Sequence, residues 1–558
     1  MKNIKFKIEL ITYLIITLFL IIILFWAISS KEGFHEDEMF SYGASNSSLG
    51  NTFLSYARVD IIDTIIKRNS PLLTFKNYLN YKVFNKDEYE KAEKNLNIDI
   101  SKSIWRTRED AIEYLQIDNI KEAIDFATVY WNTAKDVHPP LFYFLVHIIS
   151  ILFFGHFSKY IIFLLNLLFF ISTIFILRKI FVLVDKRNLS IPNLVLYGAS
   201  IGAISTVMFQ RMYMMLTFFT ILFLYINLKI VVNDFELNRK LKKELIITTI
   251  LGFLTQYNFC FYALFLSATI ILIAITRKKK INFIKKYILQ FIISALIGII
   301  IFIPSIYHIF FSYRGMGAGE RAFSLFEAFE GFLKLIFNSY SISFYLGIVL
   351  SIILVLVLLF KFKYSTSKIL YIILIIPTFL TFIMITFISP YKSLRYIMYL
   401  LPIISMIFVI LMDDLVENKI FSEFLLTIFA VYLSINGLLT NPINYLYKGY
   451  NNYIKIAEEN KNDRFVLVMP TIFSQIQDVP EFKIYKESLI INPDKLEDLK
   501  ELNEFKEENE FILGVKNWMD KPVEEVLKEV MEFTGYENYE LIYDSTKSAR
   551  LTVYKIYK

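Results

Sequence analysis

Long apolar runs, separated by short polar and basic stretches, dominate the sequence from residue 8 to residue 440. A helix that crosses the hydrocarbon core of a bilayer needs about twenty predominantly apolar residues. The pattern therefore predicts an α-helical polytopic membrane protein. The runs cover residues 8–28, 139–154, 160–177, 191–209, 212–232, 244–256, 258–276, 287–308, 338–360, 369–389, 394–412 and 420–440. Residues 244–276 read either as two helices or as one long helix broken around Gln256-Tyr257-Asn258.

Basic residues between the runs predict which helix ends face the cytosol. Clusters of Lys and Arg follow the runs that end near 177, 232, 276 and 360, and three lysines precede the first run. If every cluster is cytosolic, 160–177 runs inward and 139–154 cannot cross the membrane. We therefore expect 139–154, which is short and carries His147, to be a juxtamembrane helix in the outer interface. About eleven spanning helices remain, with the N-terminus in the cytosol and the C-terminus outside.

The first run could also be the apolar part of a cleaved signal peptide. The apolar region of a signal peptide has roughly 7–15 residues, whereas residues 8–28 are apolar almost throughout. We therefore favour an uncleaved membrane anchor.

Three long pieces of the chain are predicted to be extracytoplasmic: residues 29–138, residues 309–337 with a Gly-rich stretch at 314–321, and the tail 441–558. The first loop shows helical patterns at 87–96 and 108–130. In the tail, residues 465–469, 511–515, 539–543 and 549–557 read as strands, and 493–509 and 522–533 read as helices. We expect a membrane domain over 1–440 and a small α/β domain over 441–558.

Composition narrows the class of protein further. Hydrophobic residues make up 56% of the chain and the mean hydropathy is +0.49, which soluble domains rarely reach. The net charge is +7, but the Lys and Arg residues cluster between the apolar runs, so the charge does not indicate a nucleic-acid partner. Membrane lipids are the expected surroundings. Cys260 is the one cysteine of the sequence, which excludes a disulfide framework, a cysteine zinc site and thiol catalysis.

Four titratable residues, His35-Glu36-Asp37-Glu38, follow the first run after a short polar stretch. Carboxylates are costly beside hydrocarbon, so such a cluster indicates function. The interiors of the runs carry few charges, which favours catalysis at the membrane surface over transport through broken helices. A general base needs a partly buried carboxylate within reach of a hydroxyl, and Asp37 or Glu38 fits. The alternative is that these carboxylates cap a helix that begins near Met39.

Candidate groups for a phosphate-bearing leaving group come from several distant segments, because an anion needs cationic or hydrogen-bonding partners. Arg211 and Arg395 could instead bind lipid headgroups, and His138, ahead of two prolines, could mark a helix start. The candidates are Asp136, His138, Arg211, Tyr213, Arg321, Arg395 and Tyr396.

These segments, taken in order, resemble the C-type (GT-C) glycosyltransferases. The motifs are Asp37-Glu38, the run His138-Pro139-Pro140, and Arg395-Tyr396 followed by Leu401-Pro402. Within that group the sequence is most similar to the protein O-mannosyltransferase and aminoarabinose transferase branch, which is glycosyltransferase family 39-like. The resemblance covers roughly residues 1–440.

The resemblance implies an enzyme of the cell membrane that takes a sugar from a polyprenyl-phosphate carrier on the outer face. It implies that Asp37 is the catalytic acid, with Glu38 beside it. It places His138 at the donor phosphate and Arg395 and Tyr396 near the carrier. Related enzymes often have an acid directly before the residue that matches His138, whereas Val137 separates Asp136 from it here. The tail resembles no acceptor-binding domain.

On this hypothesis Asp37 deprotonates an acceptor hydroxyl, which displaces the lipid phosphate and inverts the anomeric centre. The acceptor is a glycan, a lipid or a protein. No metal or other cofactor is required, although residues 35–38 could hold a divalent cation. The alternative is a non-catalytic handler of lipid-linked glycans, such as a flippase or an assembly scaffold. A third reading makes the tail a binding module that the membrane part anchors.

Overall fold

The computed structural model describes residues 2–48, 51, 53, 105–277, 281–310, 324–362, 368–470, 476–545 and 551–558. Arg321, the Gly-rich stretch 314–321 and the helix predicted at 87–96 lie outside the described residues. The chain forms two compact units. The first comprises residues 1–29, 137–142 and 162–444, and the second comprises 30–136, 143–161 and 445–558.

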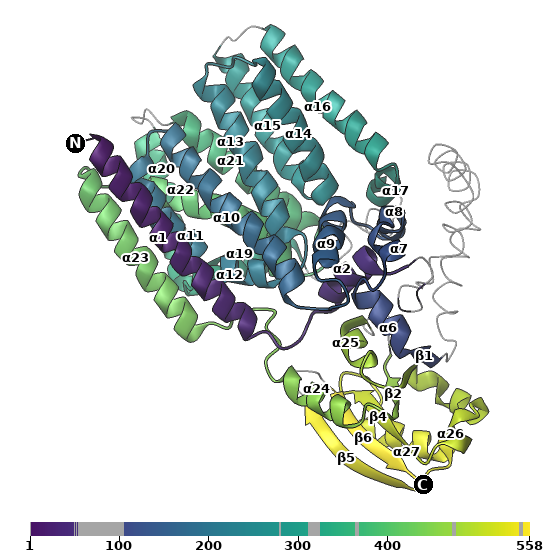
Figure 1. Ribbon diagram of the computed structural model, residues 1–558. Helices are drawn as coiled ribbons and strands as arrows, with labels where there is room; N and C mark the ends of the chain where they lie inside the picture. The colour runs from purple at the N-terminus through teal and green to yellow at the C-terminus, as the bar shows by residue number, and fades with distance from the viewer. Residues whose placement is uncertain are drawn as a thin grey trace. The chain divides into compact units, whose positions relative to one another are not determined.

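Helices build the first unit (Figure 1). Each element occupies one of the predicted apolar runs or lies between two of them. The elements are α1 (Lys2–Ser29), α10 (Tyr160–Leu183), η2 (Arg187–Leu189), α11 (Ser190–Gly198), α12 (Ile201–Met208), α13 (Tyr213–Val232), α14 (Arg239–Thr255), α15 (Phe259–Thr276), α16 (Ile281–Ile301), α17 (Pro304–Phe310), α19 (Leu325–Ser339), α20 (Phe344–Phe362), α21 (Lys368–Ile388), η3 (Leu394–Tyr396), η4 (Met398–Leu400), α22 (Leu401–Asp413) and α23 (Lys419–Thr440).

The lengths of these helices confirm a helical polytopic membrane protein. In the described part of the chain, seven helices are long and apolar enough to cross a bilayer, and nine if each bent pair is one span. The bent pairs are α11 with α12 and α19 with α20, which turn by 60° and 95°. The other two predicted spans form α14, with 17 residues, and α22, with 13, both shorter than the usual span of about twenty. Residues 244–276 form two helices, α14 and α15.

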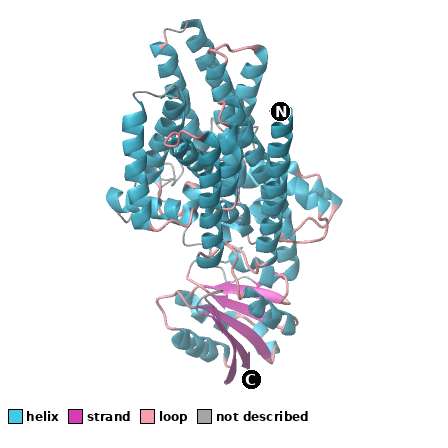
Figure 2. Cartoon of the chain, turned by 90° about the vertical axis from the view of Figure 1, so that its left-hand side faces the viewer, coloured by secondary structure: helices cyan, strands magenta, loops and turns pink. Residues whose placement is uncertain are grey.

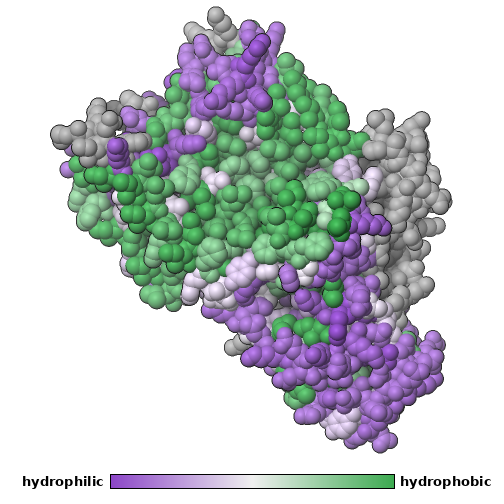
Figure 3. All heavy atoms as spheres, viewed as in Figure 1, coloured by the Kyte–Doolittle hydropathy of each residue, from purple (hydrophilic) through white to green (hydrophobic). Residues whose placement is uncertain are grey.

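Apolar side chains cover the outer surfaces of the long helices. On α1, Ile15 and Phe19 are 62% and 61% exposed, whereas Tyr13 and Leu20 are buried against the unit. Figure 3 shows the same pattern as a broad green surface over the helices, while the residues of the sheet are mostly purple. A water-soluble protein rarely exposes so much contiguous apolar surface, so these faces are suited to contact with lipid.

Ion pairs gather at the end of the first unit where α1 begins. Glu9 accepts hydrogen bonds from Arg178 at 3.0 Å and from Arg187 at 2.7 Å. At the same end, Lys186 lies 3.3 Å from Asp413 and 2.8 Å from Asp414. The charged residues thus lie where the helices α1, α10 and α22 begin or end, which leaves the interiors of these helices to apolar packing.

The second unit combines a helical layer with a six-stranded sheet (Figure 2). Its strand order is β1-β3-β2-β4-β6-β5, in which β3, β2 and β4 are parallel and the other pairs are antiparallel. The elements are α2 (Glu36–Asn46), β1 (Trp105–Thr107), α6 (Arg108–Leu115), α7 (Ile120–Ala123), α8 (Phe126–Lys135), α9 (Leu141–Leu152), α24 (Tyr450–Glu459), β2 (Arg464–Val468), α25 (Val479–Phe482), β3 (Glu487–Ile491), η6 (Pro493–Glu501), α26 (Glu504–Glu507), β4 (Glu510–Lys516), α27 (Val523–Thr534), β5 (Asn538–Ser545) and β6 (Leu551–Tyr557).

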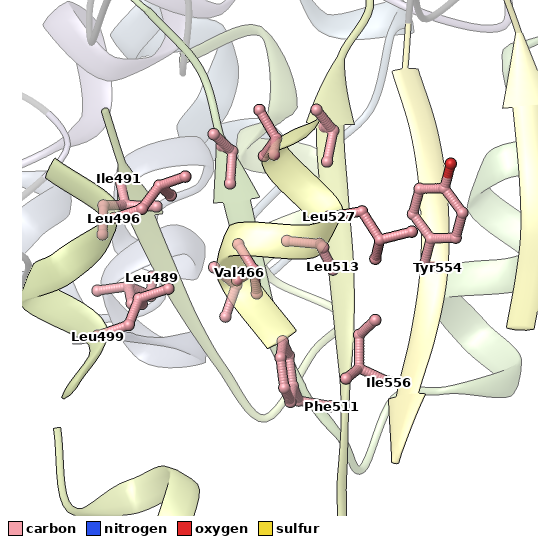
Figure 4. Packing of buried hydrophobic residues seen from close by; sticks show 14 of the residues in the cluster. Val466, Leu489, Ile491, Leu496, Leu499, Phe511, Leu513, Leu527, Tyr554 and Ile556 are labelled. Atoms are coloured by element: carbon pink, nitrogen blue, oxygen red, sulfur yellow. The ribbon is translucent and has the colours of Figure 1, made fainter. Parts of the chain in front are cut away.

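Alternating side chains along the central strands form the core of this sheet. Phe511, Leu513 and Val515 of β4 point to the same side as Val466 and Val468 of β2. Leu496, Leu499 and Leu527, from η6 and α27, complete this core (Figure 4). The small α/β domain predicted for the tail is therefore confirmed.

Some features of the second unit were not predicted. The edge strand β1 comes from the first long loop, and its partner β3 was not expected either. Residues 30–136, which the sequence analysis assigned to the membrane domain, group with the sheet in the contacts of the structure. The segment 493–509, predicted as one helix, forms the 3₁₀ helix η6 and the short α26, because the backbone of Leu502 between them is extended. Within η6, the backbone of Lys495 is not helical either.

A pair of acids is buried where α25 meets the sheet. Asp478 accepts a hydrogen bond from Lys516 at 2.8 Å and one from Tyr450 at 3.4 Å. Glu481 is fully buried near the Asp478 charge. Burial, and then the charge of Asp478, raise the pKa of Glu481 well above its usual range. The cluster is therefore electrically balanced when Glu481 is protonated.

The Glu481→Gln variant should keep its stability better than the wild type when the pH rises. The folded state holds the Glu481 proton more tightly than the unfolded state does, so this group stabilises the fold at low pH and loses that contribution as the pH rises above about 4.5. Thermal unfolding of the full chain at about pH 5 and about pH 8 measures the effect, with a melting temperature a few degrees higher for Glu481→Gln at the higher pH. The exposed Glu459, replaced by Gln, is the control. A pH dependence equal to that of the wild type would contradict the assignment.

Candidate functional site

The acidic motif starts the helix α2. His35 is the N-cap residue, and its Nδ1 accepts a hydrogen bond from the Asp37 backbone N–H at 3.0 Å. Three residues into the helix, the Glu38 carboxylate accepts the backbone N–H of His35 at 2.7 Å. This reciprocal pair is a capping box, which satisfies N–H groups that the first turn leaves unpaired. The helix thus begins at Glu36 rather than near Met39, and Glu38 is the acid whose carboxylate takes part in the cap.

Glu38 also forms a buried ion pair. The Lys31 ammonium lies 2.9 Å and 3.1 Å from its two carboxylate oxygens, and both side chains are 0% exposed. Lys31 further donates to the backbone carbonyl of Tyr445 and lies 5.3 Å from the centre of the Phe34 ring. Burial lowers the pKa of Lys31, and the neighbouring Glu38 charge opposes that shift.

Asp37 has a different environment from its neighbour. Its side chain is 16% exposed, and the carboxylate lies 3.6 Å from Nδ1 of His35. Its backbone N–H, rather than its carboxylate, takes part in the cap. Of the two predicted catalytic acids, Asp37 therefore keeps a carboxylate that is partly open, whereas the fold surrounds the carboxylate of Glu38.

Close packing fixes the rest of α2. A Cβ atom at Gly43 would lie 2.1 Å from the Tyr114 ring, so only glycine lets α2 approach α6 this closely. Asn132 of α8 donates to the carbonyl of Ser47 at 2.9 Å, just past the end of the helix. His147, predicted at the membrane interface, is 1% exposed and its Nδ1 lies 2.7 Å from the carbonyl of Ser45. His147 therefore links α9 to α2. With 12 residues, α9 is too short to cross a bilayer, and its place in the interface stays a prediction.

Arg211 and Tyr213 lie where α12 passes into α13. Asn166 of α10 donates to the carbonyls of Val207 and Phe209, which satisfies groups that the end of α12 leaves without a helical partner. This arrangement fixes the turn that carries Arg211, whose side chain is only 2% exposed. The Tyr213 ring stacks on Phe209, with ring centres 5.5 Å apart.

Arg395 and Tyr396 form the 3₁₀ helix η3. The Arg395 guanidinium lies 5.2 Å from the centre of the Tyr396 ring, and its Nη2 lies 3.4 Å from the tyrosine hydroxyl. The next turn, η4, packs against α12 and α13. The structure therefore brings the segments of Arg211 and Arg395 to the same end of the first unit.

Further polar side chains at this end were not singled out as site residues. The Tyr257 hydroxyl hydrogen-bonds to Nδ1 of His308 at 2.9 Å, and Tyr399 of η4 donates to the carbonyl of Asn258 at 3.5 Å. The signal in the sequence was the polar break Gln256-Tyr257-Asn258, which the structure places between α14 and α15.

The remaining predicted residues divide between the two units. Asp136 follows α8 in the second unit, and the chain enters the first unit at Val137. His138 belongs to the first unit, is 7% exposed and stands three residues before the start of α9. Within the described residues, no group of three or more His, Cys, Asp or Glu side chains could hold a metal ion.

The first unit also contains an apolar cavity of about 140 Å³. Helices α11, α19, α20, α22 and α23 enclose it, with Phe337, Leu354 and Phe408 among its walls. Its lining is almost entirely hydrocarbon and aromatic carbon, which suits an apolar chain rather than a polar ligand.

No protein-family model and no curated protein matches the chain. Among solved structures, the chain is similar to the crystal structure of ArnT from Cupriavidus metallidurans bound to undecaprenyl phosphate. The two sequences are 9% identical, and the match has a TM-score of 0.47 and covers 75% of this chain and 87% of ArnT.

Proposed function

We propose that this protein transfers a sugar from a polyprenyl-phosphate carrier to an acceptor hydroxyl, with Asp37 as the general base. The observation that carries the proposal is the environment of Asp37. Its carboxylate is partly exposed at the first turn of a helix whose start is fixed by the capping box and by the buried pair of Lys31 and Glu38. A base held in this way loses little freedom when an acceptor hydroxyl approaches it.

The bonds change as follows in the proposed reaction. The acceptor O–H gives its proton to the Asp37 carboxylate, and the oxygen bonds to the anomeric carbon. The bond from that carbon to the phosphate oxygen breaks, and the electron pair leaves with the lipid phosphate. Because the acceptor enters opposite the leaving group, the anomeric configuration inverts.

Cationic and phenolic groups of the first unit are suited to the phosphate. Arg211 lies between α12 and α13, and the turn η4, which follows the η3 helix of Arg395, packs against both of these helices. Guanidinium groups bind phosphate oxygens with charge-assisted hydrogen bonds. His138 and Tyr396, which the motifs implied, and Tyr213 are the further candidates. The apolar cavity among α11, α19, α20, α22 and α23 supports a polyprenyl chain as the ligand.

The proposed orientation follows from the positive-inside pattern of the loops. It places the N-terminus in the cytosol and the sheet domain outside the cell membrane, so the acceptor is an extracytoplasmic glycan, lipid or protein. Lys179, Lys186 and Arg187 lie at the end where the Glu9 pairs are found, which agrees with a cytosolic location for that end.

The Asp37→Asn variant should lose transfer activity by about 10²–10⁴-fold, because asparagine cannot accept the acceptor proton. Folding and carrier binding should remain, since the cap uses the backbone N–H of this residue. The measurement is label transfer from a panel of radiolabelled polyprenyl-phosphate sugars by the protein in lipid. Normal transfer by Asp37→Asn would exclude this base. Carrier binding without any transfer by the wild type would favour the non-catalytic glycan handler.

The Arg395→Gln variant should bind the lipid phosphate about tenfold or more weakly, since a hydrogen bond to a charged group contributes about 1.5–3 kcal/mol. Competition of a short-chain polyprenyl phosphate with a photo-crosslinkable carrier measures the change. Arg464→Gln is the control, because Arg464 pairs with Glu487 and Glu508 in the sheet domain. Equal affinities of Arg395→Gln and wild type would remove Arg395 from the phosphate site.

A further inference from the structure

The segment that carries the acidic motif, residues 30–38, is bonded to the turn that leads into the sheet domain, residues 445–451. Both segments belong to the second unit. The Glu32 backbone N–H donates to the carbonyl of Leu446 at 2.8 Å, and the Glu32 carboxylate accepts the Gly449 N–H at 2.5 Å. Gly449 has φ of 93°, a left-handed conformation that glycine adopts without strain.

Lys31 stands at the centre of this junction. Besides its ion pair with Glu38, it donates to the carbonyl of Tyr445, and its ammonium lies 5.5 Å from the centre of the Tyr447 ring. Its own carbonyl accepts a hydrogen bond from Lys159. With 0% of its side chain exposed, Lys31 has no surface on which to meet a substrate.

The contacts continue from the junction into the sheet domain. A Cβ atom at Gly33 would lie 2.9 Å from the Tyr450 ring, so the segment lies directly on α24. Tyr450 donates to Asp478, which in turn accepts from Lys516 at the end of β4. Gln477 also donates to the carbonyl of Phe34 at 3.0 Å. The segment before α2 therefore contacts the turn 445–449, α24 and the segment before α25.

A buried ion pair is a poor way to stabilise a fold, because removing two charges from water costs about as much as their attraction returns. Two apolar side chains would fill the same space at no such cost. The Lys31–Glu38 pair instead fixes the position of the Glu38 side chain, because the Lys31 ammonium and the His35 N–H both donate to its carboxylate. Asp37 lies in the same helical turn, so its backbone is held with that of Glu38.

We propose that Lys31 is a positioning residue for Asp37, and that through Lys31 and Glu32 the sheet domain sets the geometry of the base. This inference rests on the proposed function of Asp37. On this proposal the sheet domain contributes to catalysis by positioning Asp37, and it is not a separate binding module.

The test compares Lys31→Met, Lys31→Met/Glu38→Gln and Glu32→Ala in the full-length protein, with transfer kinetics and hydrogen exchange measured on each. Lys31→Met should lower kcat about 100-fold, because a small displacement of a base costs about this much. The KM for the donor should stay within about twofold, since Lys31 does not meet the substrate. Glu32→Ala should lower kcat about tenfold, as expected for a weaker hold on the same segment.

The double variant separates positioning from simple loss of folding. The glutamine that replaces Glu38 still accepts the His35 N–H, and no charge is left buried without a partner, so the double variant should fold. Its kcat should stay about tenfold or more below wild type, because Lys31 no longer holds the segment. The matched control is Lys186→Met, which breaks the pair with Asp413 and Asp414 in the first unit. It should lower the melting temperature and leave kcat unchanged.

Unchanged kcat in a folded Lys31→Met protein would overturn the positioning role while leaving the proposed function in place. If Lys31→Met does not fold, the double variant carries the test, and a wild-type kcat in it would overturn the positioning role. If the wild type transfers no sugar, the proposed function fails. The exchange of the Asp37 to Phe40 amides then decides, with faster exchange in Lys31→Met and Glu32→Ala supporting the coupling and unchanged exchange contradicting it.

Discussion

The start of α2, which carries the acidic motif, depends on the buried ion pair between Lys31 and Glu38. This pair joins the segment before α2, the first turn of α2 and the linker before α24 within one fully buried contact. An isolated charge at this place would be very costly, so each partner requires the other. The pair also makes two adjacent acids differ. The Glu38 carboxylate is buried in the ion pair, whereas the Asp37 carboxylate stays partly exposed.

The membrane environment imposes a second constraint, on the first unit. Charges are expensive inside hydrocarbon, so the charged groups of the helices gather near their ends, as the Glu9 and Asp413 ion pairs do at one end. At the other end, η4, which follows the η3 helix of Arg395, packs against α12 and α13, the helices on either side of Arg211. A lipid-linked anion is the substrate class that would use both a cationic helix end and an apolar cavity between helices.

Much of this architecture could be predicted from the sequence. Hydropathy alone located the long helices, and short apolar or alternating stretches of the tail located β2, β4, β5 and β6, since these signals are local. The strand β1 was missed because Trp105-Arg106-Thr107 is three residues long and pairs with β3, far away in the sequence. Lys31 was missed for a similar reason. A lysine after an apolar run looks like an ordinary flanking charge until the fold brings Glu38 and the carbonyl of Tyr445 to it. The sequence could not show the carbonyl groups of Ser45 and Ala123, which lie against the His147 ring.

The central claim is that the acceptor hydroxyl displaces the lipid phosphate directly at the anomeric carbon. The most direct measurement is the anomeric configuration of the product, determined by NMR after transfer from a polyprenyl-phosphate sugar of known configuration. Asp37 acting as a general base on the acceptor hydroxyl predicts inversion. Retention of configuration would contradict it, because retention requires two successive displacements or a different attacking group.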